Sequence, residues 1–225
     1  MRIVVLTGAG VSAESGLRTF RDTGGLWEGH DPMQVATPEA YASDPDLVLR
    51  FYDERRAALT RVVPNAAHAA LARLEETLGD DVLVVTQNVD DLHERAGSRR
   101  VHHLHGRLRS AWCTWCDARH EWDGTLQDRP PCPACGTSAL RPDIVWFGEV
   151  PYGMDDVGAA LWDCDLFVSI GTSGTVYPAA AFVHHARGDT LELNLEPSAG
   201  ATDFATSRHG PATELVPAWV DAILA

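Results

Sequence analysis

The sequence contains no lysine, and all eighteen of its Lys and Arg positions, in a chain of 225 residues, are arginine. A GC-rich coding sequence is the simplest explanation of this bias, and it needs no functional cause. Whatever its origin, the absence excludes acylation of the chain on its own side chains and leaves the N-terminus as the one acylatable amine.

Long apolar runs are also lacking. No segment approaches the roughly 20 apolar residues that a membrane-spanning helix requires. Met1 and Arg2 lead at once into the short run "IVVL", so no targeting segment is visible. We therefore expect a soluble, cytoplasmic protein that does not bind membranes.

An excess of positive charge is the third absence. The formal net charge is −14 and the pI about 5.0. Such a surface repels phosphate backbones, which disfavours direct binding of nucleic acid. Any anion must therefore be held by a local basic site. The sequence shows no sign of an assembly element, and we expect a monomer.

What the sequence does contain is an alternation of strand-like and helix-like segments, which predicts an α/β fold with a Rossmann-like, doubly wound parallel sheet. The segments at 17–45 and 141–149 are expected to be loops, with short helices in the first. Ser12 or Ser15 is expected to cap the helix after the first strand, and Asn65 the helix at 64–79. We expect strands within 2–16, 81–97, 101–106, 165–173 and 190–196, and helices at 44–59, 64–79, 155–163, 179–187 and the C-terminus.

Four of the five cysteines form two C-x-x-C pairs. Four thiolates at this spacing favour one closed, tetrahedral, structural zinc site, whose ligands are Cys113, Cys116, Cys132 and Cys135. The fifth, Cys164, is expected to be a buried free thiol. We predict a small four-cysteine zinc-binding domain at 107–142, inserted in a Rossmann-like domain of residues 1–106 and 143–225 that also carries a helical and loop insertion at about 17–60.

Two polar turns follow predicted strands. The turn "TGAGVSAESG" can hold a pyrophosphate against backbone N–H groups, but it departs from G-x-G-x-x-G. No acidic residue stands where a dehydrogenase holds the ribose, so hydride transfer is disfavoured. Gln87, Asn88 and Asp90 follow another strand, where parallel sheets bind ligands; a loop that satisfies its own backbone explains them equally well.

The run "HHLHG" places His103 and His105 on one face of a short strand. A single histidine is more often a satisfied polar side chain than a catalyst. His105 lies at the carboxyl end of the strand, beside Gly106, and is the better placed of the two to act in a cleft.

These motifs occur together in an order that resembles the sirtuin family. The resemblance rests on "GAGVSAESGLRTFRDTGGLW", "TQNVDDLHERAG", "HLHG", the two C-x-x-C pairs, "RPDIVWFGE", "GTSGTVYPA" and "NLEPS". It runs from about residue 3 to the C-terminus and is strongest to bacterial members and to the class III desuccinylases and demalonylases. It implies NAD-dependent deacylation of lysine, with NAD consumed as a co-substrate and one structural zinc.

The resemblance also implies site residues. His105 would be the general base, with Asn88 also catalytic and Asp90 holding the nicotinamide carboxamide. The implied NAD contacts are Gly8, Ala9, Gly10, Ser12, Phe20, Arg21, Trp27, Gln87, Asn88, Asp90, Gly171, Thr172, Ser173, Asn194, Leu195, Glu196 and Ala212. The implied contacts to acyl-lysine protein substrates are Ala36, Tyr52, Arg55, Val145, Phe147, Gly148 and Val176.

The stretch "RFYDERRAAL" bears on which acyl group is removed. Its composition alone favours solvated helix charges. The Y-x-x-R spacing of Tyr52 and Arg55 resembles that of the acid-selective class, and Ala36 matches the small residue that widens its acyl pocket. The two side chains share one helix face and can meet a distal carboxylate, whereas Arg56, about 100° further round, is expected to stay in water.

Removal of succinyl and malonyl groups, with acetyl also accepted, is therefore the leading hypothesis. The products would be nicotinamide and an O-acyl-ADP-ribose. A plain NAD-dependent lysine deacetylase and a mono-ADP-ribosyltransferase that uses the same NAD site remain alternatives. A non-catalytic zinc-ribbon binding module is disfavoured by the net charge of −14.

Overall fold

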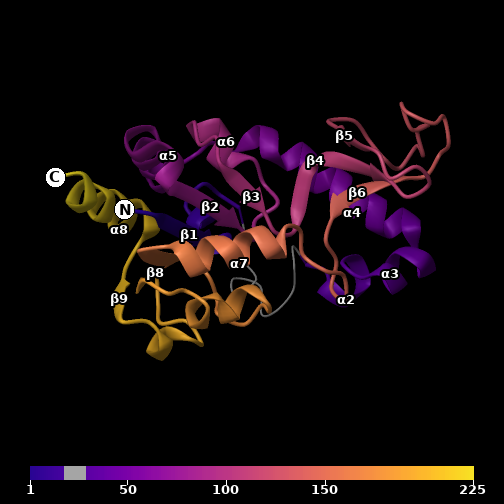
Figure 1. The fold of residues 1–225 in the computed structure, drawn as a ribbon. Coiled ribbons are helices and arrows are strands. Elements are labelled where there is room, and N and C mark those ends of the chain that lie inside the picture. Colours follow the sequence, from indigo (N-terminus) through magenta and orange to yellow (C-terminus); the bar gives the residue numbers. More distant parts are fainter. Residues whose placement is uncertain (18–28) are drawn as a thin grey trace.

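The computed structural model describes residues 1–17 and 29–225 of the chain, and Figure 1 shows how their helices and strands are arranged. A parallel sheet with helices on both faces occupies one end of the molecule. A small antiparallel sheet, packed beside three helices, occupies the other. Within the described ranges, no helix combines the length and the apolar character needed to cross a membrane.

The larger sheet has six parallel strands in the order β3-β2-β1-β7-β8-β9. Counted along the chain within this sheet, that order is 3-2-1-4-5-6, the Rossmann arrangement predicted from the sequence. The order reverses between β1 and β7, and a crevice opens at that point beyond the carboxyl ends of the strands. The strands are β1 (Ile3–Thr7), β2 (Val82–Thr86), β3 (Val101–His103), β7 (Leu166–Ile170), β8 (Asp189–Asn194) and β9 (Thr206–His209).

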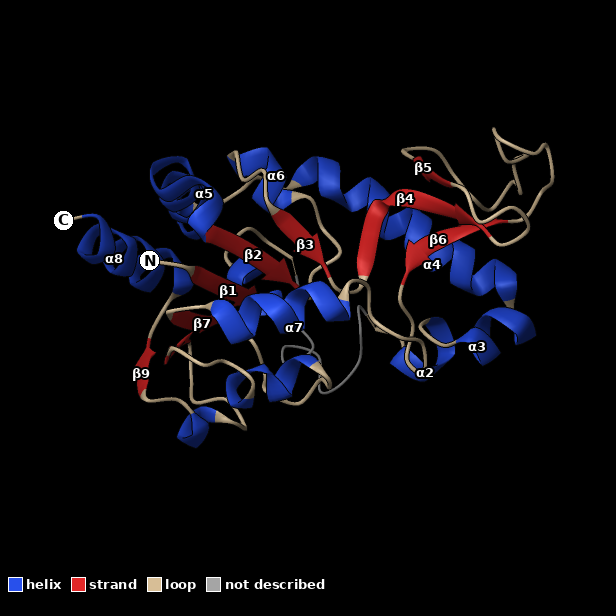
Figure 2. Cartoon of the chain, in the orientation of Figure 1, coloured by secondary structure: helices blue, strands red, loops and turns tan. Residues whose placement is uncertain are grey.

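Both faces of the central strand β1 are buried, and each of its residues is apolar except the buried Thr7. Ile3 and Val5 point into a core formed with α5 (Ala66–Leu78) and α8 (Ala212–Leu224). Val4 and Leu6 point into the opposite core, which α7 (Met154–Asp163) covers. This alternation explains the continuous hydrophobic run of the strand. Figure 2 shows α7 in front of the strands.

The second sheet is antiparallel, in the order β5-β4-β6, and shares its core with helices from an earlier part of the chain. Leu49 of α4 packs with Ala111, Cys113 and Leu140 in one of its buried clusters. Its elements and those beside it are β4 (Gly106–Cys113), β5 (Arg119–Glu121), β6 (Leu140–Ile144), α2 (Pro32–Val35), α3 (Pro38–Ser43) and α4 (Pro45–Ala58).

Four local expectations need correction. The segment predicted as a loop at 141–149 begins within β6, all of which is buried. The predicted helix at 179–187 is a short 3-10 helix, Ala179–His184. Strand β9 was not predicted, because "TSRH" lacks an apolar pattern. Ser12 does not cap α1 (Ala9–Ala13): the helix starts after Gly8 without a side-chain cap, and Ser12 is buried inside it.

The N-cap predicted at Asn65 is confirmed, and the Asn65 side chain also binds outside its own helix. Its Oδ1 accepts from the Ala67 N–H at 2.9 Å, and the His68 ring accepts from the Asn65 N–H in return. Its Nδ2 donates to the Val11 carbonyl at 2.8 Å and to the Ser15 hydroxyl at 3.0 Å. One side chain thus joins the start of α5 to α1; α6 (Leu92–Ala96) is the remaining α-helix of the described residues.

We expect Asn65→Ala to lower the free energy of unfolding by about 2 kcal/mol, because it removes a cap and two further bonds that cross between elements. Asp44→Ala is the matched control, since Asp44 also caps a helix, through Leu47, but with an exposed bond. It should cost about 1 kcal/mol or less. Urea unfolding of both variants measures the difference, and equal losses would show that Asn65 acts as a cap alone.

Candidate active site

A cleft of about 800 Å3 lies between the two sheets. One wall is formed by residues that directly follow β1, β2, β7 and β8, so it coincides with the carboxyl edge of the parallel sheet. The other wall is formed by residues of α4 and by the segment after β6. The cleft therefore occupies the crevice that the strand order predicts.

The structure brings the described residues of both predicted sets into this one cleft. From the set expected to contact NAD, the lining residues are Gly8, Ala9, Gly10, Ser12, Gln87, Asn88, Asp90, Gly171, Thr172, Ser173, Asn194, Leu195, Glu196 and Ala212. From the set expected to contact substrate, they are Ala36, Tyr52, Arg55, Val145, Phe147, Gly148 and Val176, and His105 lies with them. Phe20, Arg21 and Trp27 lie outside the described residues.

The glycine turn after β1 is required by its contact with the turn after β7. A Cβ added to Gly10 would stand 2.7 Å from the Gly171 Cα and carbonyl oxygen, and one on Gly8 would stand 2.8 Å from that oxygen. The Gly10 N–H donates to the Gly171 carbonyl at 2.8 Å, and the Gly8 N–H to the Ile170 carbonyl at 3.0 Å. These two glycines therefore shape the cleft by close approach of the backbone, with their own N–H groups already engaged.

The far side of the cleft is fixed in the same way, by bonds between neighbouring loops. Asn194, at the end of β8, donates from Nδ2 to the Thr172 carbonyl at 2.7 Å. The Gly171 N–H donates to the Leu193 carbonyl at 3.0 Å. Leu195 is 65% exposed, so its side chain is open to a ligand that enters from solvent.

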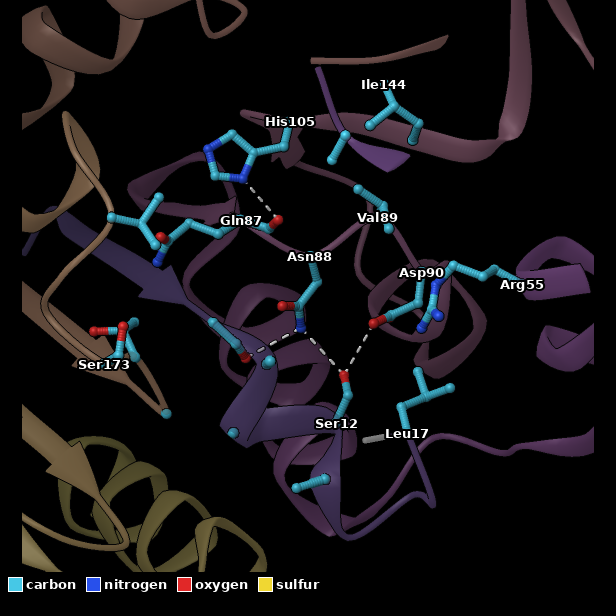
Figure 3. Close-up of a pocket in the computed structure, with 18 of the residues that line it drawn as sticks. Ser12, Leu17, Arg55, Gln87, Asn88, Val89, Asp90, His105, Ile144 and Ser173 are labelled. Carbon is cyan, nitrogen blue, oxygen red and sulfur yellow. Dashed lines mark hydrogen bonds between the residues drawn. The ribbon is translucent and has the colours of Figure 1, made fainter. Parts of the chain in front are cut away.

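Asn88 and Asp90 are tied to α1 through Ser12. The Asn88 Nδ2 donates to the Gly8 carbonyl at 3.1 Å and to the Ser12 hydroxyl at 3.2 Å. The Ser12 hydroxyl donates to Asp90 Oδ2 at 3.1 Å, as Figure 3 shows. Burial raises the pKa of Asp90, although the Leu92 N–H and Ser12 partly offset this effect. The side chains of Ser12, Asn88 and Asp90, which form the floor of the cleft, are thus joined in one hydrogen-bond network.

His105 is held in a single tautomer. Its Nδ1 lies 3.0 Å from the Gln87 carbonyl oxygen (Figure 3), and because that oxygen can only accept, Nδ1 carries the hydrogen. When the ring is neutral, Nε2 is therefore an acceptor. Burial lowers the pKa of His105, and the bond to Gln87 offsets this in part. The arrangement suits a general base, which needs a neutral imidazole.

Two buried histidines behind the cleft were missed by the sequence analysis. The Asn65 N–H can only donate, so His68 accepts at Nδ1 and donates from Nε2 to Ser12 across 3.4 Å. Burial lowers the pKa of His68 to about 4, so the ring is neutral near pH 7. His93 contacts the Thr7 hydroxyl at 3.0 Å. The N-cap-to-N3 spacing of Asn65 and His68 was the available signal.

Tyr52 is fully buried on the substrate side of the cleft, and its orientation is set by Trp146, another residue that the sequence analysis missed. The Trp146 Nε1 can only donate, so the Tyr52 hydroxyl oxygen accepts this bond at 3.0 Å. Arg141 lies over the Trp146 ring, 3.5 Å from its centroid, and pairs with Glu149 through both carboxylate oxygens. Burial raises the pKa of Tyr52, so the phenol stays protonated.

The adjacent arginines Arg55 and Arg56 of α4 differ, but not as predicted. Arg55 lines the cleft, and its guanidinium carbon lies 5.0 Å from the centroid of the Phe51 ring. The expectation that Arg56 stays in water is wrong, because Arg56 is 3% exposed. It donates to the Leu108 and Gly124 carbonyls and pairs with Asp53 at 2.6 Å. These acceptors come from the cysteine-containing segment and helix α4, which a helical-wheel argument does not include.

The four cysteines meet as predicted, and they fit a tetrahedral zinc ion. All four Sγ atoms lie within 4.8 Å of one another, and the Cys113–Cys135 and Cys116–Cys132 Sγ pairs are each 3.8 Å apart. Zn–S bonds of about 2.3 Å at tetrahedral angles give S···S separations of roughly 3.8 Å. Cys164 lies apart, buried, with its thiol donating to the Leu161 carbonyl.

Comparisons with known proteins agree with this geometry. The model of the family described as "Sir2 family" matches residues 8–178. A Pasteurella multocida (strain Pm70) protein named NAD-dependent protein deacylase is 54% identical over 230 residues, which cover 100% of this chain and 98% of the relative. The protein of the same name from Escherichia coli (strain K12) is 51% identical over 229 residues, covering 99% and 82%.

Solved structures give the same answer. A mutant Sir2 homologue in complex with ADP-ribose superposes with a TM-score of 0.91 at 39% identity, covering 99% of this chain and 92% of that one. A Sir2 homolog–NAD complex gives 0.89 at 40% identity, with coverages of 99% and 89%. A Sir2 mutant with a deacetylated p53 peptide and an O-acetyl-ADP-ribose gives 0.85 at 28% identity, with 98% and 93%.

Stripping zinc with a chelator should destabilise the whole chain, because Cys113 and Cys132 belong to the same buried cluster as Leu49 of α4. We expect one zinc per chain and a fall in Tm of about 10 °C on its removal, the shift that roughly 3 kcal/mol gives at this size. Atomic absorption and thermal unfolding measure both. Cys164→Ala is the control and should keep its zinc; an unchanged Tm without metal would contradict a structural role.

Proposed function

The chain belongs to the Sir2 family, and from that premise we propose that it is an NAD-dependent protein-lysine deacylase that prefers succinyl and malonyl groups. The observation that supports the deacylase activity is the meeting of His105, Asn88 and Asp90 with the glycine turns in one cleft. The reaction would break the amide bond of the acyl-lysine and the bond between nicotinamide and ribose, transfer the acyl group to the ADP-ribose part of NAD and consume one water. Its products would be free lysine, nicotinamide and an O-acyl-ADP-ribose. We propose for each matching residue the role that the family pattern implies.

His105 is proposed to take up a proton from a ribose hydroxyl. With Nδ1–H bound to the Gln87 carbonyl, the ring can accept only at Nε2. Asn88 is anchored through Nδ2, and Asp90 is oriented by the Ser12 hydroxyl and the Leu92 N–H. The side chains proposed to contact the nicotinamide end are therefore preorganised, which lowers the reorganisation needed during reaction.

The acyl preference is supported by the charges around the cleft. Among its described lining residues Arg55 is the single arginine, whereas five are acidic: Glu14, Glu54, Asp90, Glu149 and Glu196. An acyl group that ends in a carboxylate gains a charge-assisted bond near Arg55 and would be repelled by the acids. The neighbouring wall is apolar, with Ala36 and the buried Trp146, and accommodates the methylenes of a succinyl chain.

The activity itself is tested by incubating the protein with NAD and a succinyl-lysine peptide. We expect nicotinamide and O-succinyl-ADP-ribose in step with the deacylated peptide, detected by mass spectrometry, and a loss of about 10²- to 10⁴-fold in His105→Ala. Because burial lowers the pKa of His105 and the base must be neutral, kcat/KM should fall with decreasing pH at a midpoint below the ordinary value of 6.5. ADP-ribosylated protein without peptide deacylation would instead indicate the transferase alternative.

The acyl preference is tested separately with Arg55→Met, assayed on acetyl, malonyl, succinyl and glutaryl peptides. Loss of a hydrogen bond to a charged group costs about 1.5–3 kcal/mol, so kcat/KM for succinyl and malonyl should fall about 10- to 100-fold while that for acetyl stays unchanged. Arg50→Met, an exposed arginine on the same helix, is the matched control. A succinyl preference that survives in Arg55→Met would refute the assignment.

A further inference from the structure

His103 and His105 bind two successive carbonyl groups of the loop that follows β2. The Nδ1 atoms lie 3.1 Å from the Asn88 oxygen for His103 and 3.0 Å from the Gln87 oxygen for His105. Strand β3 runs parallel to β2, with His103 opposite Thr86, so the residues after β2 pass alongside those at the end of β3. His103 is the last residue of β3 and His105 lies in the turn before β4, and the chain there places both rings against the loop.

The two rings differ at their second nitrogen. His103 Nε2 lies 2.6 Å from Glu94 Oε1, and the His103 side chain is 8% exposed. A carbonyl oxygen can only accept, so Nδ1 of His103 donates to Asn88, and in a bond to an ionised Glu94 carboxylate its Nε2 donates as well. Both nitrogens of His103 are therefore engaged, whereas His105 has Nε2 left for the cleft. This difference explains why His105 is the candidate base and His103 is not.

Glu94 is well placed to hold the ring of His103. It lies in the first turn of α6, the helix that the same loop enters. Burial raises the pKa of Glu94, but the hydrogen bond and the charge of His103 outweigh it and keep the pKa below its ordinary value. An ionised Glu94 gives a charge-assisted bond, which is shorter and stronger than a neutral one. The loop is thus held from β3 and from α6 through a single imidazole.

Asn88 is the residue that gains from this arrangement. Its N–H donates to the Thr86 hydroxyl at 3.0 Å, its Nδ2 to Gly8 and Ser12, and its carbonyl accepts from His103. Each polar group of its backbone and the nitrogen of its side chain therefore has a hydrogen-bond partner. Without the bond from His103, the Asn88 carbonyl loses its partner and the peptide between Asn88 and Val89 is less firmly fixed, although the Leu108 N–H still holds the Val89 carbonyl at 2.8 Å.

We propose that His103, held by Glu94, is a positioning residue for the proposed deacylation: its Nδ1–H fixes the backbone carbonyl of Asn88 and so sets the geometry of the Asn88–Asp90 segment. This inference rests on the proposed function, because it assigns His103 an effect on that reaction. It predicts that the donor at the Nδ1 position matters and that the ring and its charge are secondary.

Asparagine and glutamine at position 103 separate these possibilities. The amide nitrogen of His103→Asn stands near the place of Nδ1 and can still donate to Asn88, whereas that of His103→Gln stands near the place of Nε2 and reaches Glu94. We expect His103→Asn to keep kcat within about threefold and His103→Gln and His103→Leu to lower it roughly 10- to 100-fold, the range that a small misplacement of catalytic groups produces.

His102→Leu is the matched control. His102 lies on the same strand and also binds a backbone carbonyl, that of Tyr152 at 2.8 Å. Neither His102 nor Tyr152 lines the cleft. It should lower thermal stability as much as His103→Leu does and leave kcat unchanged. If His103→Gln kept kcat and His103→Asn did not, the proposal would be overturned in favour of a role through Glu94. If kcat fell in all four variants in proportion to Tm, His103 would act on the stability of the fold and not on the geometry of the site.

Binding of ADP-ribose, measured by calorimetry, distinguishes failure of this inference from failure of the proposed function. Wild type and all His103 variants should bind it within about threefold of one another, because ADP-ribose lacks the nicotinamide that the Asn88–Asp90 segment is proposed to contact. A wild type that neither binds ADP-ribose nor deacylates would refute the proposed function. Normal binding and normal kcat in His103→Leu would refute the positioning role alone.

Discussion

The close approach of two backbone turns, at Gly8–Gly10 and at Gly171, is the constraint on which the rest of the site depends. It occurs between β1 and β7, where the strand order reverses, and an added Cβ would bring atoms to 2.7 Å. With the turns in contact, α1 starts directly at the sheet edge, and Ser12 reaches the loop after β2. A larger residue at either turn would separate the two halves of the sheet at the point where the cleft opens. Ser12 would then move away from Asn88 and Asp90, and the hydrogen bonds that join these three side chains would be lost.

Direction is the second property of this network. Several of its members can act only as donors or only as acceptors: the Asn65 N–H, the Gln87 and Asn88 carbonyls, and the Trp146 indole. The Trp146 indole makes the Tyr52 hydroxyl an acceptor, and the other three groups decide whether the ring nitrogen that faces them donates or accepts. Burial lowers the pKa of His68 and of His105, which favours the neutral rings. The polarity of the cleft floor is therefore set by the backbone, and the side chains follow it.

Much of this could be predicted from the sequence, and the failures share a cause. The parallel sheet, the Asn65 cap and the four-cysteine cluster follow from local patterns: β-branched runs, a polar residue before an amphipathic helix, and two C-x-x-C pairs. Arg56 was misjudged because its acceptors, the Leu108 and Gly124 carbonyls, lie more than 50 residues away. The segment 141–149 was predicted as a loop because its first residues pair with β4 of the small second sheet, which the sequence analysis did not predict. The role of His103 was not predicted because its partners, Asn88 and Glu94, lie in another segment.

The absence of lysine is better understood once the buried arginines are placed. Arg56 makes bonds to three acceptors in different directions through Nε and Nη1. Arg141 pairs with both oxygens of Glu149 while its flat face covers Trp146, and so helps to orient Tyr52. A lysine ammonium is a single point of charge that can neither bridge a carboxylate with two parallel bonds nor stack on an indole in this way. At these two positions the guanidinium is a structural requirement, whatever produced the compositional bias elsewhere in the chain.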